Sequence, residues 1–150
     1  MLREKEGVVS DVSWIGTDGK EVTEEAWSAG FVKCVGLRLD GKLLGEVDEH
    51  GEPIEGDTVL MLMNSHHEKI MFMLPTPVAD AFWEPMMDTA HFPGHLSDTK
   101  GGSQYELEGR SIALLRLSSP EIEGQQKEGF VAADIIAEAA MEVATPSAGQ

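Results

Sequence analysis

The sequence has 150 residues, of which 41% are hydrophobic and 25% are charged. This length suits one globular domain with its own core, and it is too short for a (β/α)8 barrel, which takes about 250 residues. The chain carries 27 acidic residues against 11 basic ones, a net charge of −16. So acidic a surface argues against nucleic acid and anionic membranes as partners.

The sequence shows neither a signal peptide nor a membrane-spanning stretch, and it contains a single cysteine. The residues from Met1 to Glu6 lack the apolar run of a signal peptide, and no stretch of about 18 apolar residues occurs that could span a membrane. Cys34 is the single cysteine, so an internal disulfide and a cysteine-based zinc cluster are excluded. We therefore expect a cytoplasmic protein, in a compartment where thiols stay reduced.

Composition divides the chain into three zones: a lead-in segment at residues 1–30, a middle zone at 31–118, and an acidic, alanine-rich tail at 119–150. In the lead-in, residues 11–15 alternate between polar and apolar side chains, which predicts a short strand. Residues 23–27 predict one helical turn, with Thr23 as the N-cap and two glutamates at the positive end of the helix dipole.

The middle zone predicts short β-strands separated by turns. Phe31, Val35, Leu37 and Leu39 share one face of the first strand. Residues 58–63 are apolar on both faces, as expected of a central strand. The next residues, 64–68, suit a hairpin loop, and Pro85 predicts an edge position for its strand. Strands are expected at residues 31–39, 43–47, 58–63, 69–74, 82–87, 105–107 and 110–117. This spacing predicts an all-β fold, an antiparallel β-sandwich of about seven or eight strands.

The tail has a different pattern. Pro120 ends the β pattern, and residues 130–144 have helical periodicity. Asp134, Glu138 and Glu142 form one acidic stripe, while apolar residues crowd the other side. We therefore expect a short C-terminal α-helix on a loose, glycine-containing linker.

His66, His67 and Glu68 form the triplet most suggestive of chemistry, because imidazoles and carboxylates serve as metal ligands and as acid–base pairs. Neighbouring side chains on a strand point to opposite faces, so on a strand the two histidines would not share one ion, whereas in a loop they could. His91 and His95 are separated by a proline and a glycine, so they do not form the one-turn helical pair of zinc enzymes. We predict a hairpin loop held by side-chain hydrogen bonds, with no metal and no cofactor.

Trp14, Trp27 and Trp83 are candidate carbohydrate-binding residues, because flat indole faces suit the C–H faces of pyranose rings. The alternative for each is packing, since tryptophan contributes a large buried area to a small domain. No nucleophile elbow, phosphate-binding loop or dinucleotide motif occurs. Cys34 lies within a predicted strand, where a small buried hydrophobic side chain is the usual role. A catalytic pair of carboxylates is defined by separation in space, so it cannot be chosen among 27 acids.

Several segments together carry a family resemblance. Trp14 is followed by Asp18-Gly19, by Glu21-Val22-Thr23 and by Ala26-Trp27, and further along come Asn64-Ser65-His66-His67-Glu68 and Trp83-Glu84. Other matching segments are residues 39–41, 46–51, 57–60, 86–89 and 105–115. The order and spacing of these segments over residues 8–117 resemble bacterial glycogen debranching enzymes of the isoamylase type. There the corresponding stretches are a Pro-Asp-Gly turn, Glu-Met-Thr, Asp-Trp and Asn-Ala-His-His-Glu, from which this chain departs at Thr17, Val22, Ala26 and Ser65.

The resemblance implies the C-terminal β-sandwich domain of such an α-1,6-glucosidase. The family's catalytic residues belong to a (β/α)8 barrel, and no position here matches their motifs, so no catalytic residue can be assigned. The implied role is non-catalytic: structural support for, or docking on, a catalytic barrel domain or chain in glycogen breakdown, with an α-glucan as a further partner.

Two other interpretations remain open. The first is a free-standing carbohydrate-binding module for α-glucans, and the second is a catalytic sandwich that uses His66, His67 and Glu68. Two exposed and coplanar tryptophans would favour glucan binding. Tryptophans that are all buried, or that lie on one apolar face, would favour domain packing instead.

Overall fold

A computed structural model describes residues 11–30, 32–42, 46–92 and 94–120. These residues form eight strands and one short helix. The elements in chain order are β1 (Val12–Ile15), α1 (Glu24–Ser28), β2 (Cys34–Leu39), β3 (Val59–Asn64), β4 (Ile70–Met73), β5 (Phe82–Asp88), β6 (Thr99–Lys100), β7 (Gln104–Leu107) and β8 (Ser111–Ser118). The expected C-terminal helix and the strand expected at residues 43–47 fall wholly or partly outside the described residues.

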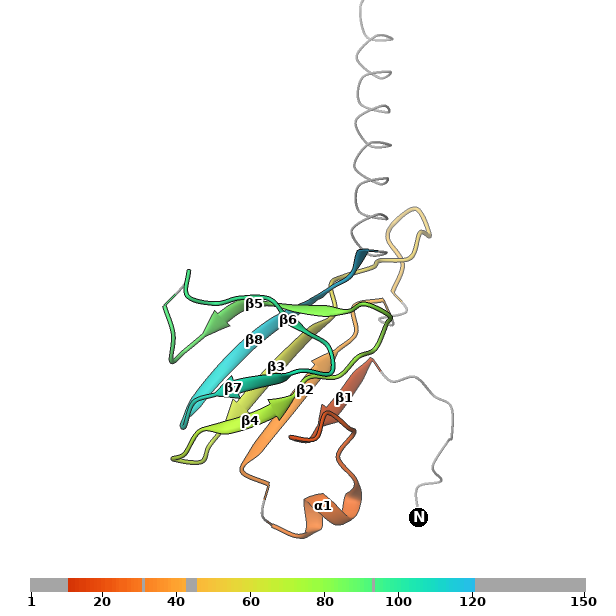
Figure 1. The fold of residues 1–150 in the computed structure, drawn as a ribbon. Helices are drawn as coiled ribbons and strands as arrows, with labels where there is room; N and C mark the ends of the chain where they lie inside the picture. The colour runs from red at the N-terminus through yellow and green to blue at the C-terminus, as the bar shows by residue number, and fades with distance from the viewer. Residues whose placement is uncertain (1–10, 31, 43–45, 93, 121–150) are drawn as a thin grey trace, which may run out of the picture.

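The strands form two sheets with antiparallel pairing. The larger sheet has six strands in the order β1-β2-β3-β8-β5-β6, and β4 pairs with β7 in a second sheet of two strands. Figure 1 shows the two-stranded sheet lying across one face of the larger one. The predicted all-β sandwich is therefore confirmed, and β3 is a central strand, flanked by β2 and β8.

The core lies between the two sheets. The larger sheet contributes alternate residues, so that Leu60 and Leu62 of β3 point inward, and the smaller sheet contributes Phe72 and Leu107. Gly36 of β2 lies beneath this contact, where an added Cβ would come within 3.1 Å of the Phe72 ring and 3.2 Å of Leu60. The space is tight for even one added carbon, so a side chain here would have to displace its neighbours in the core.

The hairpin predicted around residues 64–68 is wrong. β3 does not pair with β4, because both of its edges are already bonded, to β2 and to β8. Instead, the chain leaves the larger sheet after Asn64 and crosses to the smaller sheet, where β4 pairs with β7. Residues 64–68 therefore connect the two layers of the sandwich.

The strand that contains Pro85 is an edge strand only in part. β5 pairs with β8 along its length, while β6 covers only Phe82 and Trp83 on the other side. The ladder with β8 shifts register between Pro85 and Met87, which agrees with the missing amide donor of proline.

The predicted strand and helical turn of the lead-in are both present. β1 pairs with β2, from Val12 opposite Leu39 to Ile15 opposite Gly36. The Thr23 hydroxyl accepts a hydrogen bond of 3.3 Å from the Ala26 amide and so caps α1. Within the described part of the chain, no helix has the length and apolar character needed to cross a membrane.

Candidate docking surface

The side of the six-stranded sheet that faces away from β4 and β7 is lined with apolar side chains. We call this surface the outer face. Since side chains alternate along a strand, the residues between the inward-pointing core positions project onto it. Its members are Val12, Trp14, Val35, Leu37, Leu39, Val59, Met61, Met63, Phe82, Met87, Ile112 and Leu114, all of them exposed or only half-buried.

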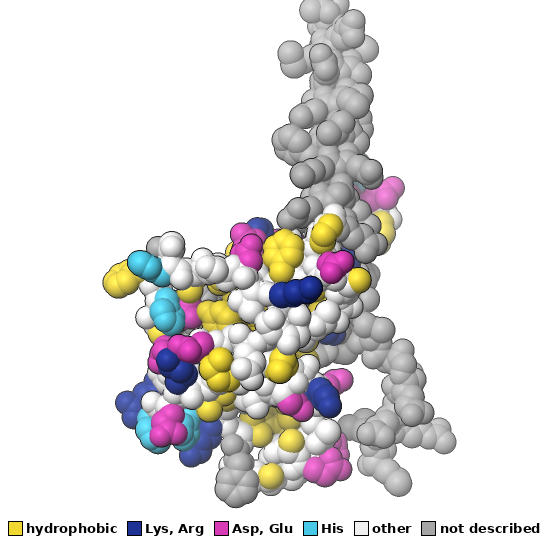
Figure 2. Space-filling model, in the orientation of Figure 1, with side chains coloured by type: hydrophobic (Ala, Val, Ile, Leu, Met, Phe, Trp, Pro, Cys, Tyr) yellow, Lys and Arg dark blue, Asp and Glu magenta, His cyan; other side chains and the backbone are white. Residues whose placement is uncertain are grey.

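The strand registers align these residues into continuous rows. One row runs across five strands, with neighbours paired in the order Trp14, Leu37, Met61, Leu114 and Met87. The opposite side of the molecule differs from the outer face. Figure 2 shows hydrophobic side chains scattered there among charged and polar ones. Large contiguous apolar surfaces on small domains often mark interaction sites, so the outer face is a candidate docking surface.

Charged groups border the outer face at one end. The next row ends in Arg116 of β8 and Glu84 of β5, whose side chains form an ion pair of 2.6 Å. Asp57 lies 3.6 Å from the same guanidinium. An apolar centre with a polar rim is the usual anatomy of a protein–protein interface.

The three tryptophans occupy two different environments. Trp83 is fully buried in the core, and its indole N–H donates to the Pro75 carbonyl at 2.9 Å, so it presents no face to a sugar. Trp14 and Trp27 are 40% and 43% exposed. Their ring centroids lie 5.6 Å apart with the planes at 89°. The two exposed tryptophans are thus perpendicular, not coplanar, and Trp14 belongs to the outer face.

A groove of about 700 Å³ lies beside α1. The segment before α1 contributes Asp18 and Glu21, the segment before β2 contributes Lys33, and His66 reaches it from the connection between the sheets. Cys34 also lines the groove, and partial burial raises the pKa of its thiol to about 11. The thiol is therefore protonated at neutral pH, which suits packing against the core and does not suit nucleophilic chemistry.

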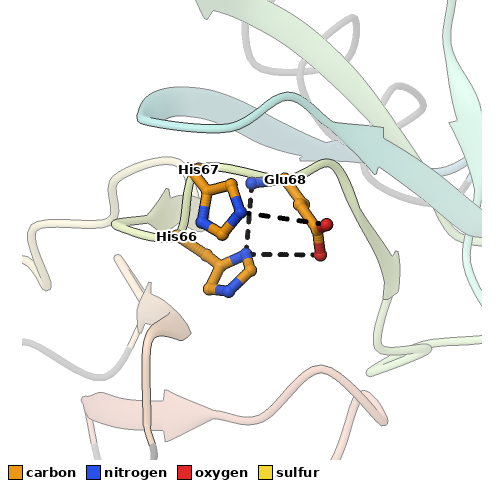
Figure 3. Close-up of side chains that lie close together, drawn as sticks. All are labelled: His66, His67 and Glu68. Atoms are coloured by element: carbon orange, nitrogen blue, oxygen red, sulfur yellow. Dashed lines mark hydrogen bonds and ion pairs between the residues drawn. The ribbon is translucent and has the colours of Figure 1, made fainter.

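His66, His67 and Glu68 lie together in the connection between β3 and β4. The two imidazole rings are 4.3 Å apart and tilted by 33°, and Figure 3 shows the Glu68 carboxylate facing both of them. His66 Nδ1 lies 3.9 Å from one carboxylate oxygen, and His67 Nε2 lies 3.8 Å from the other. The three residues form a loop, so the opposite-face geometry of a strand does not separate them.

Sequence reasoning identified the histidine loop and the tryptophans, Trp14 among them, but not the other strand positions that form the outer face. The signal was present in β3, whose residues are apolar at every position from Val59 to Met63. From the sequence alone, that pattern predicts a central position in the sheet. The structure gives it a second cause, because one side of β3 packs on the core and the other side belongs to the outer face.

Comparison with known proteins agrees with this architecture. Residues 11–116 match the family described as "Isoamylase, C-terminal". The chain is also 29% identical over 109 residues to the "Glycogen operon protein GlgX homolog" of Mycobacterium bovis and to proteins of the same name from two strains of Mycobacterium tuberculosis. The aligned region covers 72% of this chain but 15% of each relative, so the chain spans a small part of their length. Since the family match extends over most of the chain and over every described strand but the end of the last, this protein belongs to the isoamylase C-terminal family.

Proposed function

We propose that this chain is a non-catalytic C-terminal domain of a glycogen-debranching hydrolase, and that its outer face docks on a catalytic barrel. The barrel is either part of the same protein or a separate chain. The observation that carries the proposal is the continuous apolar row from Trp14 to Met87, whose members are exposed or half-buried. Its setting is the cytoplasm, the compartment expected from the single cysteine.

The composition of the outer face fits such a role. Met61, Met63 and Met87 supply flexible, polarisable side chains that adapt to an irregular partner surface. The ion pair between Arg116 and Glu84 lies at the border of the apolar rows, where it can set the register of docking without the cost of deep burial. A net charge of −16 favours a partner that is neutral or basic at its own interface.

Glucan binding is the alternative function, and the exposure of Trp14 and Trp27 is the observation in its favour. A stacking platform for a glucan needs flat aromatic faces that are aligned with one another. The two rings here are perpendicular, and Trp14 is continuous with the aliphatic row of the outer face. Domain packing therefore accounts better for their placement.

The test uses a matched pair of methionines. Met87 on the outer face is 46% exposed, and Met71 on β4, away from the outer face, is 44% exposed. A GlgX protein truncated before its C-terminal domain serves as the partner, and affinity is measured by titration calorimetry. We expect Met87→Glu to weaken binding by about tenfold or more, since a buried methionine contributes about 1.5–3 kcal/mol, and Met71→Glu to leave it unchanged.

Activity and glucan-binding assays separate the alternatives. The chain alone should release no linear chains from a branched glucan in a reducing-end assay. Equal effects of the two methionine variants, or no association with the barrel fragment, would contradict docking. Binding of maltooligosaccharides that is lost on Trp14→Ser or Trp27→Ser would favour the carbohydrate-binding module instead.

A further inference from the structure

The connection that carries His66, His67 and Glu68 has a fixed backbone. Asn64 is buried at its start, and its side-chain amide donates to the carbonyls of Glu68 at 2.9 Å and Glu108 at 3.0 Å. The side-chain oxygen of Asn64, Oδ1, accepts a hydrogen bond of 2.9 Å from the backbone amide of His66. One buried side chain therefore holds both ends of the triplet.

The turn between β7 and β8 fixes the loop from the other side. The Arg110 amide donates to the His66 carbonyl at 2.8 Å. An added Cβ on Gly109 would lie 2.3 Å from the His67 carbonyl oxygen, so a side chain at this position would displace the loop. These contacts place the three side chains on one rigid turn, and rigid placement is what a binding site needs.

The side chains of this turn bring three ligand atoms together. One donor atom from each of His66, His67 and Glu68 lies within 4.8 Å of the others. The two imidazole–carboxylate distances, 3.8 and 3.9 Å, are too long for hydrogen bonds. A tetrahedral ion with bonds of about 2.0–2.2 Å holds its ligand atoms about 3.4 Å apart. The two imidazole–carboxylate distances, which end on different carboxylate oxygens, exceed this spacing by about half an ångström, and all three ligand atoms lie within 4.8 Å of one another. Rotation of the exposed His67 and Glu68 side chains can close these gaps.

The His66 ring is already in a tautomer that can bind a metal. Its Nδ1 accepts a hydrogen bond of 3.1 Å from the Glu68 amide, so this nitrogen carries a lone pair and no proton. Metal ligands must be unprotonated at the coordinating atom. An ion at this nitrogen would replace the Glu68 amide, and because the bond between them is exposed, water can take over as the acceptor of that amide.

We propose that His66, His67 and Glu68 bind one divalent first-row transition ion, with the remaining coordination positions open to water. Two imidazoles and one carboxylate select zinc, nickel or copper over calcium and magnesium, which prefer oxygen ligands. The sequence predicts a hairpin loop here with no metal. In the connection between the sheets that is found instead, the three side chains converge. This metal-site proposal does not depend on whether the outer face docks on a barrel.

The experiment is a zinc titration of the full chain, without a histidine tag, followed by calorimetry. We expect saturable binding of one ion. His67→Ala and Glu68→Gln should each weaken the affinity by about tenfold or more, the effect seen when even outer-shell partners of a metal are lost. His50→Ala, an exposed histidine in another turn, is the matched control and should bind as the unmodified chain does.

Paramagnetic nickel gives a second readout that does not depend on affinity. Amide signals of residues 64–69 should broaden first in NMR spectra of the folded chain, and His67→Ala should abolish this selectivity while the rest of the spectrum is retained. The proposal is overturned if zinc shows no saturable site, if His50→Ala weakens binding as much as His67→Ala, or if calcium competes with zinc. The last result would indicate non-specific binding to acidic side chains.

Discussion

Removal of the Tyr105 hydroxyl group should show how much one hydrogen bond between the two sheets contributes to the stability of the domain. Asp88, at the end of β5 in the larger sheet, is buried. Its carboxylate accepts hydrogen bonds from the Tyr105 hydroxyl of β7, at 2.6 Å, and from the Ala90 amide, at 2.8 Å. His91 Nδ1 lies 3.2 Å from the same carboxylate. Tyr105→Phe deletes the bond between the sheets while it keeps the aromatic ring in the core.

The expected loss follows from the charge of the acceptor. A hydrogen bond to a charged group contributes about 1.5–3 kcal/mol. Because Ala90 and His91 remain on the carboxylate, the variant leaves Asp88 partly satisfied, and we expect a loss of about 2 kcal/mol at pH 7. With a urea dependence of about 2 kcal/mol per molar for a domain of this size, the unfolding midpoint should fall by about 1 M.

The loss of stability in Tyr105→Phe should be larger at neutral pH than at acidic pH. Burial alone would raise the pKa of Asp88, but the hydrogen bonds from Tyr105, Ala90 and His91 outweigh it and lower the pKa below its usual value. A lowered pKa in the folded state stabilises the protein above the unfolded value of about 4, and that contribution is lost as the pH falls through the folded value. The difference in unfolding free energy between the unmodified chain and Tyr105→Phe should therefore have its full value at pH 7 and should become smaller below about pH 4.

Urea unfolding, followed by tryptophan fluorescence, to which the buried Trp83 contributes, measures these differences at pH 7 and pH 3. Asp88→Asn is the control background, because Tyr105 then donates to a neutral group and its loss should cost about 1 kcal/mol or less. A midpoint shift below about 0.3 M at pH 7 would refute the reasoning. So would a shift that is the same at pH 3, or the same in the Asp88→Asn background.

Three further predictions concern the core, the tail and the outer face. Gly36→Leu should destabilise the domain by about 1–3 kcal/mol through overpacking against Phe72, seen as a lower melting temperature. Removal of residues 121–150 should leave a single cooperative melting transition in calorimetry, since the core formed by the described residues extends from Ile15 to Leu117. Sedimentation should show self-association that rises with salt, as screening over about 8 Å weakens the repulsion of acidic surfaces. Trp14→Ser should reduce that association, and an association that falls with salt would contradict a hydrophobic contact.

Local pattern was sufficient to predict most strands but not their partners. The alternation at β1 and the capped turn at α1 depend on neighbouring residues, so both were predicted correctly. Pairing depends on which edges remain free after the whole sheet has formed. The chain after Asn64 therefore crosses to β7 instead of returning beside β3, and no local signal distinguishes these two outcomes. β6, with only two residues, is too short to produce a periodic pattern.

For the candidate sites too, residue types could be read from the sequence, whereas their arrangement in space depends on distant residues. The residue types at 66–68 suggested a cluster that the sequence alone predicted to hold no metal. Whether those side chains converge depends on the buried Asn64, whose amide bonds to Glu108, more than 40 residues away in the sequence. In β2, the apolar positions predicted to share a face do so at Val35, Leu37 and Leu39, yet that face is the outer one. The buried position between them is Gly36, and a hydrophobicity pattern cannot identify a glycine as part of a core.

The central position of β8 has a consequence for how the domain is made. β8 pairs with β3 on one side and with β5 on the other, and it is the last described strand to be synthesised. Until residues 111–118 are available, the three-stranded and two-stranded parts of the larger sheet cannot join, and β3 and β5 each keep an open edge flanked by apolar side chains. Nascent or truncated chains that end before β8 should therefore be prone to aggregation and dependent on chaperones.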